Sequence, residues 1–265
     1  MIGGITMADE KINENTPEQE RPEGEGNVLA GFVLYKDANM DWARFKKLLK
    51  DDWNITADDE VKDDALVFTV DDMMVACSLL PNPVPGDEAV EAARRNILWK
   101  DGADEVRKHG AHVMLAVMNK FDPIDQQELF AQVASCLMKL DNAIGIYKSP
   151  TVYEKEFYIN FAKTIADGET PVPIYVYVGM YKDENGVCAF TSGMRYFGRE
   201  EMEVIGSRLA PNDLLSFMYT IAEYVITEDV ELKDGETIGF TEDQKIPISV
   251  SKGVSVSGDS IKIRI

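Results

Sequence analysis

Apolar and polar positions in the first half of the chain alternate between the spacing of strands and the spacing of helices. Four apolar runs have the length of buried strands, at 31–35, 65–70, 73–80 and 111–118. Asp71-Asp72 predicts a tight turn between the second and third runs. Apolar residues three and four apart predict helices that begin after Asp41 and after Asp87, with a further short helix at 103–109. The resulting order, β-α-β-β-α-β, is typical of a ferredoxin-like unit.

The middle of the chain continues with helical spacing. Asp122-Pro123 predicts the start of a long helix, because proline is well tolerated at the first helical position. A short strand is expected at 143–147. Thr151 followed by Glu154 has the pattern of a capping box, which predicts that another helix begins there.

The last part of the chain has the pattern of strands around one helix. Residues 183–186, Asp-Glu-Asn-Gly, lie between two apolar runs and predict a β-hairpin. Acidic and apolar residues alternate over 201–206, which predicts an outer strand. Residues 211–226 have the spacing of an amphipathic helix. Three short strands are expected after it, with the sequences ETIGF, KIPISV and IKIRI.

These elements predict an α+β protein. Residues 1–26 are polar and acidic, and we expect them to be a disordered tail. Residues 27–149 form the expected ferredoxin-like half, and 150–265 form a half in which antiparallel strands pack with helices. Because no flexible linker separates the halves, we expect one compact body.

The net charge of −20 is the largest deviation in composition. Such a charge repels phosphate backbones and attracts cationic partners, so we expect no nucleic acid and a basic protein as partner. No apolar run approaches the roughly 18 residues of a membrane span, and the N-terminus lacks the basic and apolar regions of a secretory signal. The three cysteines are far apart and odd in number. They are typical of buried, reduced thiols in a cytoplasmic protein.

Residues 191–204, TSGMRYFGREEMEV, hold the main candidate binding residues. Arginine offers a planar fork of donors that suits carboxylate or phosphate groups. The candidates in this corner are Arg195, Tyr196, Arg199, Glu201 and Glu203. The alternative is structural: Gly193 and Gly198 let the chain turn, Phe197 fills the core, and the arginines pair with glutamates at the surface. We favour this structural interpretation.

Tyrosines and histidines give two further groups of candidates. Tyr175 and Tyr177, with Tyr181, alternate along one predicted strand, where they form either a binding surface or a layer packed under the 211–226 helix. His109 and His112 are the only histidines, and the helix end predicted between them argues against a shared metal site. The sequence contains no common nucleotide, zinc-protease or serine-hydrolase motif. We therefore expect no metal and no cofactor.

Four stretches of the C-terminal third together resemble a known family. They are the 183–186 hairpin with its flanking strands, TSGMRYFGREEMEV, PNDLLSFMYTIAEYVI and DGETIGF. In combination they resemble an uncharacterised, mainly bacterial family known as domain of unknown function 4261, over roughly residues 170 to 265. The resemblance brings no activity, cofactor or catalytic residue with it.

The sequence favours a non-enzymatic cytoplasmic interaction protein that binds a cationic partner. A toxin is one candidate partner, by analogy with small acidic α/β proteins that neutralise toxins. The alternative function is an enzyme, a hydrolase of a small polar substrate with its site between Arg195 and Glu203. That alternative predicts a concave pocket at the corner and a carboxylate with a perturbed pKa.

Overall fold

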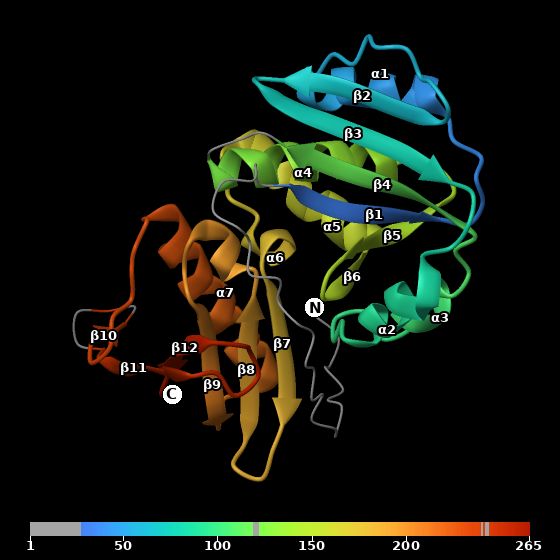
Figure 1. Ribbon diagram of the computed structural model, residues 1–265. Coiled ribbons are helices and arrows are strands. Elements are labelled where there is room, and N and C mark those ends of the chain that lie inside the picture. The colour runs from blue at the N-terminus through green and yellow to red at the C-terminus, as the bar shows by residue number, and fades with distance from the viewer. Residues whose placement is uncertain (1–27, 119–121, 240, 242–243) are drawn as a thin grey trace. The chain divides into compact units, whose positions relative to one another are not determined.

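The computed structural model describes residues 28–118, 122–239, 241 and 244–265 (Figure 1). It confirms the α+β class, with helices and two separate sheets. The chain divides into two compact units, of which the N-terminal one ends at Ile174 and the C-terminal one is Tyr175–Ile265. This division lies later in the chain than the predicted one at 149–150. The predicted acidic tail, 1–26, lies outside the described residues.

The N-terminal unit is built on a six-stranded antiparallel sheet. Its strand order is β2-β3-β4-β1-β5-β6. The strands are β1 (Leu29–Tyr35), β2 (Ala65–Val70), β3 (Met73–Leu80), β4 (Ala111–Met118), β5 (Ala143–Lys148) and β6 (Thr151–Glu154). The four predicted apolar runs are therefore strands, and Asp71-Asp72 forms the turn between β2 and β3.

The strand order within this sheet departs from the predicted ferredoxin-like arrangement. A split β-α-β unit has one strand between its first two strands. Here both β3 and β4 lie between β1 and β2. Strand β4 pairs directly with the whole length of β1, from Leu29 opposite Val117 to Tyr35 opposite Ala111. The order of elements along the chain was predicted correctly, whereas their lateral order was wrong.

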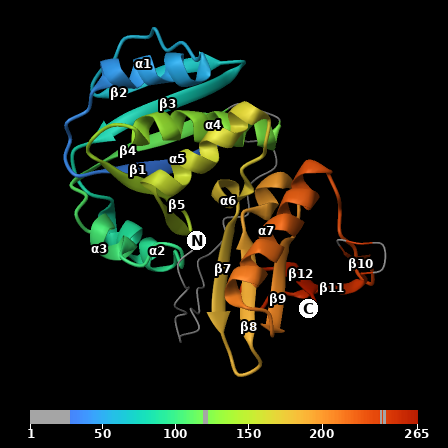
Figure 2. The same ribbon diagram turned by 180° about the vertical axis from the view of Figure 1, so that it is seen from behind.

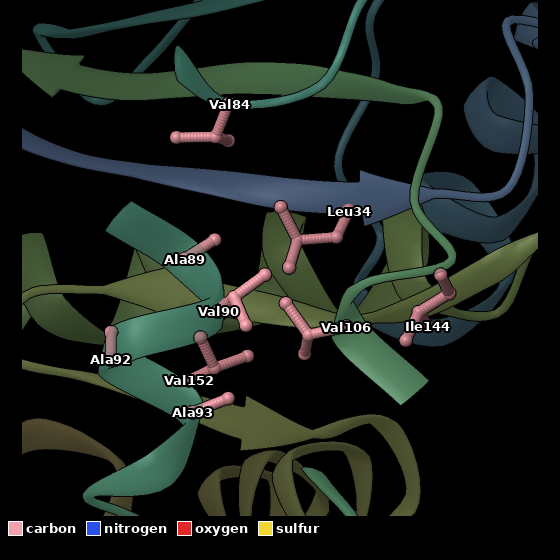
Figure 3. Close-up of a cluster of buried hydrophobic side chains, with 9 residues drawn as sticks. All are labelled: Leu34, Val84, Ala89, Val90, Ala92, Ala93, Val106, Ile144 and Val152. Atoms are coloured by element: carbon pink, nitrogen blue, oxygen red, sulfur yellow. The ribbon is translucent and has the colours of Figure 1, made fainter. Parts of the chain in front are cut away.

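Helices cover one face of this sheet and only one end of the other. The first face carries α1 (Trp42–Trp53), α4 (Pro123–Met138) and α5 (Lys155–Lys163) (Figure 2). On the second face, α2 (Glu88–Arg94) and α3 (Gly102–Val106) pack over β5 and β6. Figure 3 shows their side chains meeting Leu34 of β1, Ile144 of β5 and Val152 of β6 in a buried cluster.

Two local predictions in this unit need correction. The Thr151–Glu154 segment is strand β6, paired with β5, and not the first turn of a helix. Helix α5 begins at Lys155, with the Glu154 carboxylate accepting from the amide of Phe157 at 3.3 Å. Asp87 does precede a helix, but its side chain makes no cap hydrogen bond. By contrast, Asp41 and Asp122 cap their helices as predicted.

The C-terminal unit holds a second sheet, with strand order β10-β11-β12-β9-β8-β7. Its strands are β7 (Tyr177–Lys182), β8 (Val187–Ser192), β9 (Glu201–Ser207), β10 (Thr237–Ile238), β11 (Ile246–Lys252) and β12 (Asp259–Ile263). Helix α7 (Pro211–Thr227), predicted as an amphipathic helix over 211–226, packs against β7 and β8, and its apolar side is buried, including Leu214, Met218 and Ile221. The hairpin at 183–186 is confirmed.

Strand β9 was predicted as an outer strand, and this was wrong. It lies inside the sheet, antiparallel to β8 and parallel to β12. Its first four residues are all buried, including both glutamates.

In the part of the chain that the structure describes, no helix has the length and apolarity needed to cross a membrane.

Candidate functional site

The Glu203 side chain, on strand β9, binds a loop that is distant in the sequence. This distant loop is residues 253–258, between β11 and β12. Its carboxylate is fully buried, and it accepts from the amides of Val254 (3.1 Å) and Ser255 (2.6 Å). The Ser260 hydroxyl (2.6 Å) and the Lys262 ammonium (2.5 Å) also donate to it. Burial alone would raise the pKa of Glu203, but these hydrogen bonds outweigh it and lower the pKa. The carboxylate is thus a buried anion with all its neighbours acting as donors.

Glu201, on the same strand, binds the segment that precedes β9, through Thr191, Gly193 and Arg195. It is buried, and it accepts from the Thr191 hydroxyl (2.6 Å) and from the amides of Gly193 (2.8 Å) and Arg195 (3.4 Å). These amides belong to the start of the short 3-10 helix Met194–Phe197. A carboxylate near such amides satisfies donors that the helix itself leaves unpaired.

Arg195 is directed toward the same distant loop as Glu203. Its guanidinium donates to the carbonyl oxygens of Ser257 (2.5 Å) and Asp259 (3.3 Å), and it lies 3.6 Å from the Glu200 carboxylate. Tyr196 is half-buried, with its ring edge-on to Phe197 at a centroid distance of 5.5 Å. The corner is therefore cross-linked internally by its charged side chains.

Residues 190–264, which include this whole corner, match one family model. The matching family is Domain of unknown function (DUF4261). The predicted family is thereby confirmed for the C-terminal part of the chain. No curated protein and no solved structure matches the chain.

A pocket of about 120 Å³ lies within the DUF4261 segment, and helix α7 contributes Val225 to its lining. Its lining residues are Gly198, Arg199, Glu200, Met202, Val225, Glu231, Leu232 and Ile261. Arg199 forms an ion pair with Asp229 and donates to the Gly198 carbonyl at 3.2 Å, while its Nε is buried without a hydrogen-bond partner among the described residues. Neither Glu201 nor Glu203 lines this pocket, so the structure brings Arg199 to it without the two predicted carboxylates.

The tyrosines of the predicted strand are divided between two elements. Tyr175 is the last residue of the short helix α6 (Val172–Tyr175), where it is buried and stacks on Phe197 at 6.4 Å. Tyr177 begins β7, is half-buried, and meets Phe190 edge-on at 6.2 Å. Only Tyr177 and Tyr181 therefore share a strand face, and the Tyr181 hydroxyl accepts from Ser255 at 3.1 Å.

Both histidines bind backbone groups of the loop that precedes α2. The Nε2 atom of His109 accepts from the Val84 amide at 2.9 Å, and Nδ1 of His112 lies 2.8 Å from the Asn82 carbonyl oxygen. Burial lowers the pKa of His112. Within the described ranges, no three histidine, cysteine or acidic side chains gather as metal ligands would.

The three cysteines are free and buried, in accord with their apolar sequence context. Burial raises the pKa of Cys77 and Cys188, and it raises that of Cys136 to about 12. A thiol with a raised pKa is a poor nucleophile at neutral pH, so these side chains act as small hydrophobic residues.

Sequence reasoning gave no sign of Lys148. Its ammonium donates to the Gln127 side chain at 2.7 Å and to the Ile174 carbonyl at 3.2 Å, and it lies 5.7 Å from the centre of the Phe130 ring. Burial lowers its pKa to about 7. A single lysine at a strand end has no sequence pattern that would reveal these contacts.

Sequence reasoning also missed an uncovered sheet face in the N-terminal unit. None of the described helices of this unit lies over β2, β3 and β4 on the side of α2 and α3 (Figure 1). The register places one set of alternate side chains there, which we call the open face: Ala30, Val67, Thr69, Met74, Ala76, Ser78, Met114, Ala116 and Met118. The face has no charged residue, and Val67 and Met114 are 46% and 40% exposed.

The border of the open face at β2 is strongly acidic. Residues 58–72, which lead into β2, form it and turn toward β3, contain seven aspartates and glutamates and one lysine. Asp63 and Asp64 immediately precede β2, and Asp71 and Asp72 immediately follow it, all four exposed. An apolar patch with a charged rim is the usual anatomy of a protein–protein interface.

Proposed function

We propose that this protein is a non-enzymatic, cytoplasmic interaction module that binds a basic protein through the open face. The observation that carries the proposal is that this face lacks charge and exposes valine and methionine side chains. An antiparallel sheet with a solvated face normally carries polar residues there. Exposed apolar patches with polar rims are typical of binding sites.

Charge determines the kind of partner. The acidic border at β2 and the net charge of −20 favour a partner that carries lysine and arginine around an apolar patch. A cationic toxin is one class of protein with this chemistry, and neutralising it would require only tight binding. The free cysteines of the described chain support a reducing compartment.

The test compares two variants that place a carboxylate at an exposed apolar position. Met114→Glu charges the open face, whereas Tyr224→Glu charges α7 at a site that is 48% exposed. The tagged proteins are used for affinity capture from the source cytoplasm at low and high salt. We expect the Tyr224→Glu variant to capture a basic protein that the Met114→Glu variant does not capture. Salt should weaken this capture, because exposed charges are screened beyond about 10 Å at 0.1 M. Capture that survives Met114→Glu, or that is lost equally with both variants, contradicts the proposal.

A second candidate function is the binding or hydrolysis of a small polar molecule in the pocket beside Arg199. The observation in its favour is the buried Nε of Arg199, which has no hydrogen-bond partner among the described residues. A screen of small carboxylates and phosphates by ligand-observed NMR tests it. A ligand that Arg199→Gln abolishes and Arg208→Gln retains supports a site there, and turnover of that ligand would then indicate an enzyme. The absence of any Arg199-dependent ligand contradicts this candidate.

A further inference from the structure

Strand β2 is the edge of the first sheet, and half of its backbone groups point away from β3. The Asp64 carbonyl accepts from the Leu79 amide at 2.9 Å, which fixes the direction of the alternation. Because bonded and non-bonded pairs alternate in an antiparallel ladder, Leu66 and Phe68 direct their N–H and C=O groups toward β3. Val67 and Thr69 direct theirs outward, away from β3. Strand β2 is the outermost strand at its side of the sheet (Figure 1).

One end of this edge is already occupied. Ala65 and Lys62 exchange both of their backbone hydrogen bonds, at 2.8 and 2.9 Å. The other end is closed by the turn at Asp71-Asp72. Among the described residues, the outward groups of Val67 and Thr69 have no backbone partner. Val67 and Thr69 therefore offer two outward N–H donors and two outward C=O acceptors, which a short extended segment of another chain can pair with.

The side chains beside this free edge match the same kind of partner. Val67 lies on the open face next to Ala76, so an added strand would place alternate side chains against that face. Carboxylates stand at both ends of the free edge, at Asp63 and Asp64 on one side and Asp71 and Asp72 on the other. They suit lysine or arginine residues that flank a short apolar segment.

We propose that β2 accepts an extended segment of the basic partner as an added strand, with apolar residues on the open face and basic residues at both ends. This inference rests on the proposed function and specifies how the partner binds. The same four carboxylates would also keep β2 from pairing with a second copy of this chain, since charged residues protect sheet edges. The experiment must therefore separate recognition of a segment from simple protection of the edge.

Thr69→Pro and Thr69→Val make the matched pair of variants. Proline at position 69 removes an outward N–H and leaves the ladder to β3 intact, because that N–H does not point to β3. Valine removes the same hydroxyl and keeps the N–H. The probes are two synthetic peptide panels in which valine and threonine alternate, one flanked by paired lysines and one by paired glutamates. Binding is measured by fluorescence anisotropy, and circular dichroism confirms that both variants are folded.

We expect the lysine-flanked panel to bind wild type and Thr69→Val, and Thr69→Pro to bind at least about tenfold more weakly, since it loses a hydrogen bond and leaves a carbonyl unpaired. The glutamate-flanked panel should not bind. Equal binding by both Thr69 variants, or no binding by the lysine-flanked panel, overturns the inference. If Thr69→Pro still captures a basic protein that Met114→Glu loses, the open face binds its partner without an added strand, and only the proposed function survives.

Discussion

Replacing Glu203 with glutamine tests how the corner of the DUF4261 segment is held together. The native carboxylate receives four donors, two of them amides from a loop far along the chain. Glutamine has nearly the same shape, but one acceptor oxygen becomes a donor and the negative charge is lost. At least one donor then faces an NH2 group, and the Lys262 ammonium loses its ion-pair partner.

The expected loss of stability follows from these contacts. Hydrogen bonds to a charged group contribute about 1.5–3 kcal/mol each. Breaking a buried ion pair by removing one partner costs about 3–5 kcal/mol. Because the Lys262 side chain is still 14% exposed and can turn toward water, we expect a loss near or somewhat below the lower end of this range. Glu203→Gln should therefore lower the free energy of unfolding of the C-terminal unit by about 2–4 kcal/mol.

The pH dependence provides an independent check. The pKa of Glu203 is lowered in the folded state from its ordinary value of 4.5. Its contribution to stability is thus fully present above pH 4.5 and is lost as the pH falls through the lower, folded-state pKa. Below that pKa the wild-type side chain is protonated and resembles glutamine, so the difference between wild type and variant should shrink in acid.

The assay is urea unfolding by far-UV circular dichroism, together with hydrogen exchange of the 252–260 segment. All three tryptophans, Trp42, Trp53 and Trp99, lie in the N-terminal unit, so their emission checks that unit separately. Glu200→Gln is the control, because that carboxylate is half-exposed and its pair with Arg195 is worth no more than about 1 kcal/mol. A loss below about 1 kcal/mol for Glu203→Gln, or a loss that persists undiminished at pH 3, would refute the reasoning.

Three other predictions concern single sites. Gly193→Ala should lower the free energy of unfolding by about 1–3 kcal/mol, and by more than Gly198→Ala does. Both glycines have positive φ, but only a Cβ at position 193 would meet a backbone oxygen, at 3.1 Å. Thermal unfolding of the two variants measures the difference. Stability should fall as the pH drops below 6.5, because burial lowers the pKa of His112 and its neutral form stabilises the fold; His112→Gln should flatten this part of the pH–stability curve. All three thiols should react with a soluble disulfide reagent far more slowly in native protein than in urea, and rapid native labelling of any one would contradict their burial.

The elements that sequence predicted well are those whose signals are local. The apolar runs predicted β2, β3 and β4 with the bounds that the structure shows, because these strands are buried along most of one face. Aspartate before helical spacing gave the starts of α1 and α4. The order of strands across the sheet was not predicted, because it depends on pairing between residues far apart in the chain.

Two predictions were wrong because the residues of a local pattern make contacts with other parts of the chain that the pattern does not indicate. Thr151 and Glu154 have the spacing and residue types of a capping box, yet the backbone of this segment pairs with β5 as a strand. Glu201 and Glu203 alternate with apolar residues as on a surface strand, yet both are buried. Nothing near them in sequence indicates that Val254 and Ser255 will supply donors to Glu203. A buried carboxylate is predictable only when its donors are local.

The two units therefore use acidic side chains in different ways. In the DUF4261 segment, Glu201 and Glu203 are turned inward and fix loops, and Arg195 binds backbone carbonyls of the same region. In the N-terminal unit, the acids around β2 stay exposed beside a face that carries no charge of its own. Charge that is already bonded internally contributes little to recognition, whereas exposed charge beside an apolar face can select a partner. The proposed function therefore places the residues that set partner choice in the N-terminal unit, outside the segment that matches the family.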